Sequence, residues 1–232
     1  MRISNKILMA LASLLFSISV CAQKQDGELG SWFVYTFNSD FDNSLWGING
    51  DIQYRNWNVT GLTQQLLIRG GGHFTPKNSR FKFTLGYAYI SSHYRDNGEF
   101  KNSENRIYQE IRYPSKLGER LYLVQRVRIE QRFIQNENFR TRFRYSLGID
   151  LPLNHRLLIK NTWFVSFYDE VFFNGQKEIS DTENVDIFDR NRLYLSLGYV
   201  FSAHLKMSLG FLNQVTTETN KNQLTLTVAH TF

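Results

Sequence analysis

Cysteine, proline and long apolar runs are scarce in this chain of 232 residues, which has one cysteine and three prolines. A single cysteine, Cys21, cannot form a disulfide within the chain, and this excludes the small disulfide-stapled secreted modules. After Val20 no stretch stays apolar over the roughly 20 residues that a transmembrane helix needs. A membrane protein of this composition would therefore have to cross the bilayer with β-strands, since half of each strand in a barrel can be polar.

The first 23 residues, MRISNKILMALASLLFSISVCAQ, have the pattern of a secretory signal peptide. Arg2 and Lys6 precede an apolar run over 7–20, and Ala22 offers a small residue for cleavage. We expect a signal peptide over 1–22 and a single exported domain over 23–232. Lipid attachment through Cys21 is the competing interpretation, although Val20 stands where lipidation usually requires a small residue.

The exported domain carries little net charge. Without Arg2 and Lys6 it has 25 basic and 21 acidic residues. Together with export, so small a surplus argues against nucleic acid as a partner. Aromatic residues are abundant by contrast, at 15% of the chain.

The stretch 119–151, ERLYLVQRVRIEQRFIQNENFRTRFRYSLGIDL, alternates apolar and polar residues with the period of two that is typical of β-strands. Val127 and Ile129 share an apolar face, and Arg126 and Arg128 share the opposite, charged face. A soluble sheet would place the arginines in water and pack its aromatic face in a core. A membrane barrel inverts this arrangement, because lipid contacts the apolar face and the arginines line the interior.

Similar alternation along the rest of the chain predicts about eleven strands. Beside the two in 119–151 they cover 29–38, 45–57, 62–74, 81–90, 107–113, 156–173, 190–201, 205–215 and 223–232, and polar loops are expected over 91–105 and 174–186. The predicted fold is all-β: a transmembrane antiparallel up-and-down barrel of 10–12 strands with short periplasmic turns and longer extracellular loops.

An odd number of strands conflicts with this fold, because a purely antiparallel barrel closes only with an even number. Three explanations remain open. The segment 29–38 pairs in another way, residues 23–28 add a short strand, or the loop near Asn174 hides one.

The chain ends on an alternating strand, QLTLTVAHTF, with an aromatic residue at its end. Outer-membrane barrels resemble one another in this ending, which is read by the barrel assembly machinery, so Phe232 is the expected assembly signal. A soluble sandwich could also end in phenylalanine by chance. With the signal peptide and the alternation, however, the ending predicts a bacterial outer-membrane location and outer-membrane lipid as a partner.

The interior of such a barrel would hold a ladder of charged residues, with Asp51, Asp150 and Glu170 as further acids facing the arginines. Two hypotheses follow: a narrow channel that favours small anionic solutes, because fixed positive charge between low-dielectric walls concentrates anions, or a closed structural or interaction barrel with a salt-bridged interior. The arginines are Arg55, Arg69, Arg106, Arg112, Arg126, Arg128, Arg132, Arg140, Arg142, Arg144, Arg190 and Arg192. Arg126, Arg128, Arg142 and Arg144 are expected to meet Glu110 and Glu130 across neighbouring strands.

Catalytic signals are weak. Of the five histidines only His93 lies in a suitable cluster, beside Ser91, Ser92 and Asp96, where an outer-leaflet lipid-modifying enzyme could keep a triad. Such a sequence in a polar loop is more often ordinary loop composition, so an enzyme is the least favoured class and no catalytic residue is assigned. No spacing of histidine, cysteine and carboxylate indicates a metal site, and no cofactor is expected.

Eight short phrases occur in order along the chain: QYRNWN, QQLLIRGG, LGYAYI, ENRIYQEIRY, RVRIEQRF, FRYSLGIDLPL, DRNRLYLSLGYVF and GFLNQV. Together they resemble domain-of-unknown-function family 2490, over about 29–232. The resemblance implies an outer-membrane barrel of Gram-negative, Bacteroidetes-like bacteria. It implies no activity, substrate or catalytic residue.

Overall fold

The computed structural model describes residues 24–25, 28–59, 61–96, 98–180 and 183–232. The predicted signal peptide over 1–22 lies outside the described residues. The described chain is built from strands and turns, and none of its segments forms a helix long and apolar enough to cross a bilayer. The strands are β1 (Lys24–Gln25), β2 (Gly30–Asp40), β3 (Trp46–Asn56), β4 (Thr63–Phe74), β5 (Lys82–His93), β6 (Phe100–Leu117), β7 (Leu121–Ile134), β8 (Arg140–Pro152), β9 (Thr162–Asn174), β10 (Phe188–Val200), β11 (Leu205–Val215) and β12 (Thr219–Thr231).

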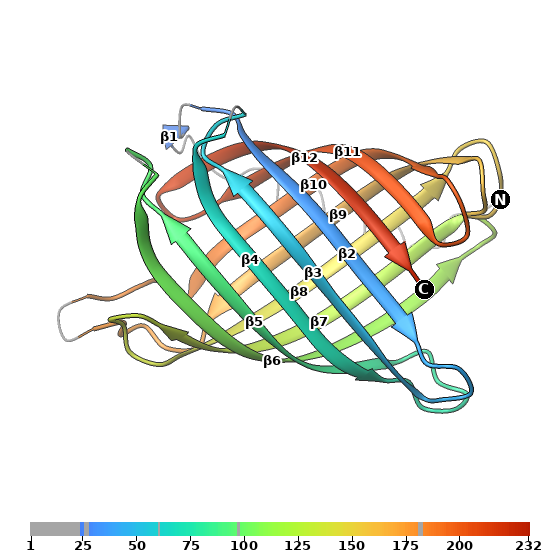
Figure 1. Ribbon diagram of the computed structural model, residues 1–232, viewed down its shortest axis with the longest axis horizontal. Helices are drawn as coiled ribbons and strands as arrows, with labels where there is room; N and C mark the ends of the chain where they lie inside the picture. The colour runs from blue at the N-terminus through green and yellow to red at the C-terminus, as the bar shows by residue number, and fades with distance from the viewer. Residues whose placement is uncertain (1–23, 26–27, 60, 97, 181–182) are drawn as a thin grey trace, which may run out of the picture.

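Strands β2 to β12 form a closed barrel of eleven strands (Figure 1). Each strand pairs antiparallel with the next along the chain, and β12 then pairs with β2 to close the sheet. The all-β barrel with 10–12 strands is therefore confirmed.

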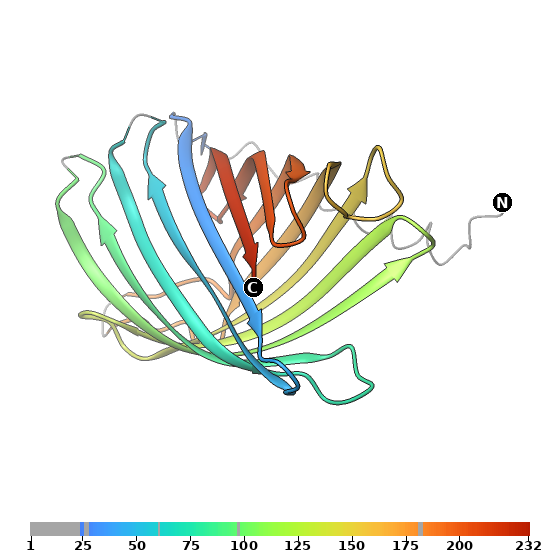
Figure 2. The same cartoon turned by 45° about the vertical axis from the view of Figure 1, so that its right-hand side comes forward.

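The closing pair explains how an odd number of strands makes a barrel. β2 and β12 run in the same direction, with Phe33 opposite Leu226 and Phe37 opposite His230 (Figures 1 and 2). The first segment thus pairs in another way than its neighbours. The two residues of β1 also pair parallel with β12, at Thr219 and Asn220, without taking part in closure. In the described part of 175–187 the chain makes one isolated bridge, between Glu178 and Asn184.

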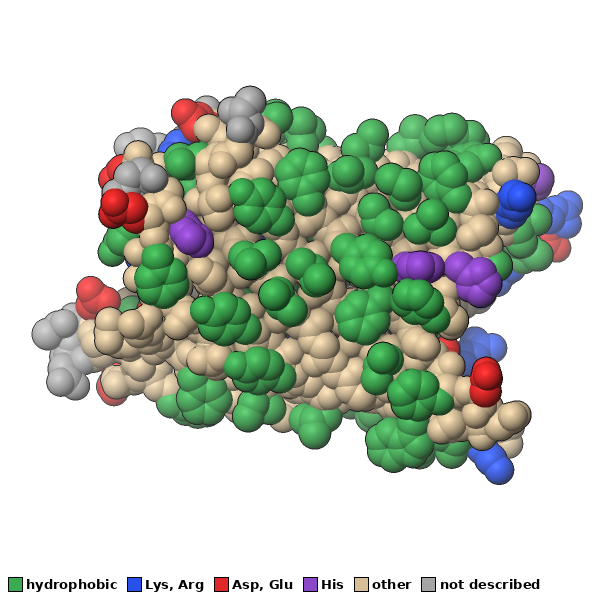
Figure 3. All heavy atoms as spheres, in the orientation of Figure 1, with side chains coloured by type: hydrophobic (Ala, Val, Ile, Leu, Met, Phe, Trp, Pro, Cys, Tyr) green, Lys and Arg blue, Asp and Glu red, His purple; other side chains and the backbone are tan. Residues whose placement is uncertain are grey.

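The barrel is apolar outside and polar inside. Leu85 and Leu209 on the outer face are 63% and 66% exposed, whereas Arg128 and Glu130 on the inner face are 2% and 1% exposed. Figure 3 shows hydrophobic side chains over the outer wall in view, with the charged side chains gathered at its two ends. The period of two along each strand produces this division, because successive side chains point to opposite faces of a sheet.

One predicted loop is wrong. The stretch 91–105 was expected to be a long polar loop, but β5 continues to His93 and β6 begins at Phe100. The described residues between these strands are 94–96 and 98–99, and Gly98 adopts a positive φ of 72°. The stretch is polar because half of its strand residues face the charged interior, and hydropathy cannot separate such residues from a loop. The last strand likewise begins earlier than predicted, at Thr219.

Gly86 on β5 has no side chain, and this leaves space for the ring of Tyr108 on β6. A Cβ atom at Gly86 would come within 2.3 Å of the ring of Tyr108 on the neighbouring strand. Tyr108 is 1% exposed, and the guanidinium carbon of Arg128 lies 4.5 Å from its ring centre. The space at Gly86 therefore lets the ring of Tyr108 lie against the guanidinium group of Arg128.

Replacing Gly86 with alanine should lower the free energy of unfolding by about 1 to 3 kcal/mol, because the new methyl group overpacks Tyr108. Thermal unfolding followed by the β-sheet circular dichroism signal measures this. Gly72→Ala is the control, since a Cβ atom there meets no atom within 4 Å. Equal unfolding temperatures for the two variants would contradict the role given to Gly86.

Candidate functional site

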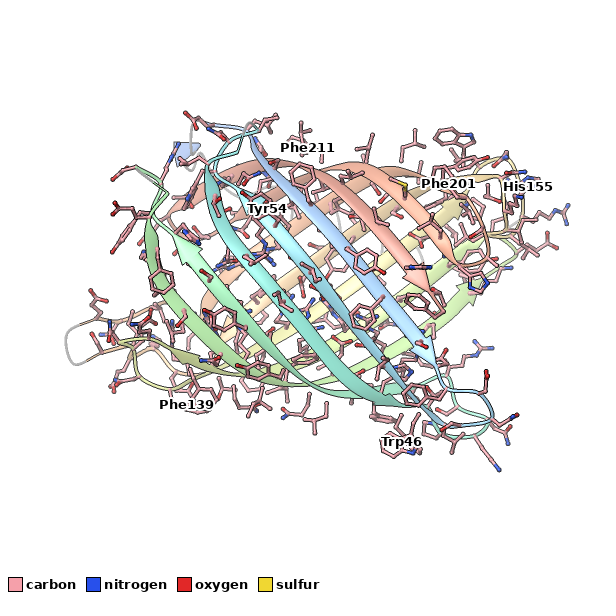
Figure 4. All side chains as sticks on the ribbon, viewed as in Figure 1. Trp46, Tyr54, Phe139, His155, Phe201 and Phe211 are labelled. Carbon is pink, nitrogen blue, oxygen red and sulfur yellow. The ribbon has the colours of Figure 1, made fainter. Side chains whose placement is uncertain are left out.

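All twelve arginines of the predicted ladder lie on the inner wall of the barrel, on β3, β4, β6, β7, β8 and β10. In Figure 4 side-chain nitrogen atoms gather within the barrel, whereas the labelled Trp46 and Phe139 point away from it. Ten of these arginines form ion pairs with seven carboxylates. The ten are Arg69, Arg106, Arg112, Arg126, Arg128, Arg132, Arg140, Arg142, Arg144 and Arg190, and the seven are Asp51, Glu104, Glu110, Glu130, Glu137, Glu170 and Asp189.

Glu130 on β7 is the centre of the network. Its carboxylate accepts hydrogen bonds from Arg142 Nη2 at 2.6 Å and from Arg144 Nη1 at 2.5 Å, both on β8. Arg106 on β6 and Arg128 lie 3.7 and 3.8 Å away. One buried carboxylate therefore neutralises charge on three neighbouring strands.

Two further carboxylates extend the network across the barrel. Glu110 accepts hydrogen bonds from Arg112 Nε at 2.5 Å and from Arg128 Nε at 2.6 Å. Glu170 on β9 pairs with Arg144 at 2.7 Å and also with Arg126. These contacts link β6, β7, β8 and β9 through side chains in addition to their backbone ladders.

Three acids of the network, Glu104, Glu137 and Asp189, were not predicted from the sequence. Glu104 pairs with Arg106 and Arg132, each at 2.5 Å, and it was missed because it lies in the segment predicted to be a loop. Asp189 pairs with Arg142 at 3.0 Å and Arg190 at 2.9 Å. The pairing of β10 with β9 shifts register between Phe188 and Arg190, and this bulge brings Asp189 to the arginines against the alternation. Bulges of this kind leave no clear signal in the sequence.

The acids predicted to face the arginines do not all do so. Asp51 pairs with Arg69, but Asp150 accepts a hydrogen bond from Ser166 and has no arginine within 4.0 Å among the described residues. The prediction for Asp150 is therefore corrected. The strand beside it offers Ser166 at the opposite register position, whereas the arginines of β8 lie further along the strand.

Aromatic rings form a second support for the guanidinium groups. Arg144 lies 4.4 Å and Arg192 lies 4.7 Å from the ring centre of Phe172, which is fully buried. The negative face of an aromatic ring attracts a cation at such distances. The ring of Phe172 therefore lies against the guanidinium groups of Arg144 and Arg192 and partly compensates their charge.

Arg55 and Arg192 have no carboxylate within 4.0 Å in the part of the chain that the structure describes. Arg55 donates to the neutral side-chain oxygens of Gln53 and Gln65, at 2.5 Å each, and Arg192 donates to that of Gln214 at 2.8 Å. Both lie over the ring of Trp32, at 3.9 and 4.9 Å. The interior therefore keeps positive charge that its own acids do not neutralise.

Three cavities of about 340, 450 and 180 Å³ occupy the interior between these side chains. Arg69 lines all three, and Trp32, Arg126 and Tyr168 line both of the larger two. The interior is thus divided into compartments by charged and aromatic side chains. The arrangement can hold anions and water between these side chains.

The histidine cluster does not form a triad. Ser91 Oγ lies 3.2 Å from His93 Nε2, but His93 Nδ1 contacts the backbone oxygen of Gly98 at 2.9 Å, where a triad would need a carboxylate. Among the described residues no group of three or more histidine, cysteine and acidic side chains could hold a metal ion.

Replacing Glu130 with glutamine should destabilise the fold by about 3 to 5 kcal/mol, because it leaves buried guanidinium charge without its partner. Urea unfolding of the purified protein measures the loss. Glu119→Gln is the matched control: its partner is Arg156, both side chains are more than 70% exposed, and about 1 kcal/mol or less is expected. A small loss in both variants would show that water reaches the network freely.

Comparison with known proteins gives a family without an assigned activity. A family model described as "Protein of unknown function (DUF2490)" matches residues 29–225. No curated protein and no solved structure matches the chain. The match covers nearly the whole barrel, from the residue before β2 into β12. The chain is therefore a member of this family of proteins of unknown function.

Proposed function

We propose that this protein is an exported barrel of the bacterial outer membrane with a narrow lumen that favours small anions. The observation that carries the lumen proposal is the surplus of interior arginines over the carboxylates that pair with them. Fixed positive charge between low-dielectric walls concentrates anions and repels cations.

The outer surface supports a membrane location. Aromatic side chains pack on one another near both ends of the barrel, as membrane barrels place them at the two interfaces. At the end that holds the C-terminus, Trp46 packs on Phe74 and Trp163 on Tyr199, each pair with ring centres 4.9 Å apart. At the other end Phe133 packs on Phe139 at 5.3 Å. Outer-membrane lipid is the partner that this surface fits.

The end of β12 supports assembly by the barrel assembly machinery. Phe232 is 62% exposed, its ring stacks on His230 at 4.1 Å, and its backbone N–H donates to Asn38 on β2 at 2.9 Å. The exposed ring lies at the end of the last strand, where the assembly machinery can contact it. Phe232 is therefore proposed as the assembly signal, with the signal peptide directing export.

The closed structural barrel is the second candidate, and the ion pairs that separate the cavities favour it. Arg69 and Arg126 lie between the two larger cavities and are held by Asp51 and Glu170. If these pairs never open, ions do not pass. Conductance decides between the two candidates.

The location proposal predicts that the protein stays in the membrane pellet after carbonate and high-salt washing, because its outer face contacts lipid rather than a peripheral partner. Immunoblotting of the washed fractions measures this, with a known periplasmic protein as the control. Release of the protein by carbonate alone would overturn the membrane location.

The channel proposal predicts small conductance steps in planar bilayers and a reversal potential, in a potassium chloride gradient, that indicates a preference for chloride. Heat-unfolded protein added to the same bilayer is the control and should give no steps. Absence of steps from the folded protein would support the closed barrel, and a preference for potassium would overturn the anion proposal.

A further inference from the structure

The largest unneutralised positive charge in the described interior lies around Trp32 on β2. Arg55 approaches this ring from β3 and Arg192 from β10, so strands on both sides of the closing pair contribute to one site. Both arginines are more than nine-tenths buried, at 7% and 9% exposure. Their hydrogen-bond acceptors are amide oxygens of glutamine, which carry no formal charge.

The cavity beside this pair contains further donors without an acceptor. Arg55, Arg192 and Trp32 line the cavity of about 340 Å³ together with Arg140 and Arg190. The Nε atoms of Arg140 and Arg190 and the Nε1 atom of Trp32 are buried and make no hydrogen bond. Buried donors normally have partners, so this concentration of unused donors on one cavity points to an acceptor group from outside the chain.

The chemistry of the donors selects the kind of anion. A guanidinium group presents a planar fork of N–H donors that matches the two oxygens of a carboxylate or a phosphate. Chloride can contact such a fork, but it lacks the two spaced oxygens that accept its two N–H groups in parallel. Leu67, Ile134 and Leu212 line the same cavity and give a carbon skeleton apolar surface to contact.

We propose that the Arg55–Trp32–Arg192 site binds the oxyanion group, carboxylate or phosphate, of a small organic solute. The inference rests on the proposed anion-favouring lumen and names its substrate class. A bound oxyanion would accept hydrogen bonds from the unpaired N–H donors of the cavity. Its negative charge would lie between the buried guanidinium groups of Arg55 and Arg192. The cavity volume lies at the lower end of the range for small-molecule sites, which suits a solute of a few carbon atoms.

Isothermal titration of the detergent-folded full chain tests the site, with succinate and inorganic phosphate as probes and chloride kept constant. Saturable binding of at least one probe is expected. Arg55→Gln and Arg192→Gln should each weaken it about tenfold or more, because each removes one charged fork. If one of the two variants does not fold, the other is sufficient for the test. Folding is checked by the β-sheet circular dichroism signal.

Arg112→Gln is the matched control. It removes the same charge from the inner wall, but Arg112 lines the other two cavities and pairs with Glu110. Its affinity for the probe should stay within about twofold of the unsubstituted protein, far less than the effect expected from losing a charged fork. An equal loss in all three variants would overturn the site in favour of general attraction by the lumen, and an absence of saturable binding would overturn it outright.

Conductance separates this inference from the function on which it rests. Anion-selective steps without saturable binding would leave the channel standing and remove the site. Binding that depends on Arg55 and Arg192, in a barrel without conductance, would keep the site and overturn the channel.

Discussion

The burial of guanidinium groups inside the barrel, away from bulk water, is the constraint on which the rest of this structure depends. An isolated buried charge costs several kcal/mol, and it is tolerated when ion pairs and hydrogen bonds compensate it. Glu130 and Glu170 meet this requirement by each pairing with arginines from more than one strand. The same contacts join β6 to β9 on the inside, so charge neutralisation and cross-strand linkage are produced by the same residues.

The inner wall is consequently uneven around the barrel. From β6 to β9 it carries most of the ion-pair network, whereas along β11, β12 and β2 it presents mainly uncharged side chains such as Ser208, Thr225 and Thr36, together with Lys206. Arg55 and Arg192 stand on the strands that border the neutral part, with Trp32 between them. The acids on these or adjoining strands pair with other arginines: Asp51 with Arg69, Glu170 with Arg126 and Arg144, and Asp189 with Arg142 and Arg190.

The alternation of residues was enough to predict the barrel and the side of each strand on which the arginines stand, since a period of two fixes the faces once one face is apolar. It was not enough to find Glu104, whose polar neighbours suggested a loop, or Asp189, which a bulge turns toward the arginines. The partner of Asp150 depended on register across two strands, which no local pattern contains. Whether the barrel closes with an odd or an even number of strands was ambiguous for a similar reason, because the pairing of β2 with β12 is set by closure of the whole sheet.

The parallel pairing of β2 and β12 has a consequence for the path of the chain. The chain runs from one rim of the barrel to the other eleven times, which is an odd number. Gly30 at the start of β2 and Thr231 at the end of β12 therefore lie at opposite rims. In a barrel inserted in a bilayer, these two residues would face different aqueous compartments. An up-and-down barrel with an even count returns its chain to the rim where it started, and this one does not.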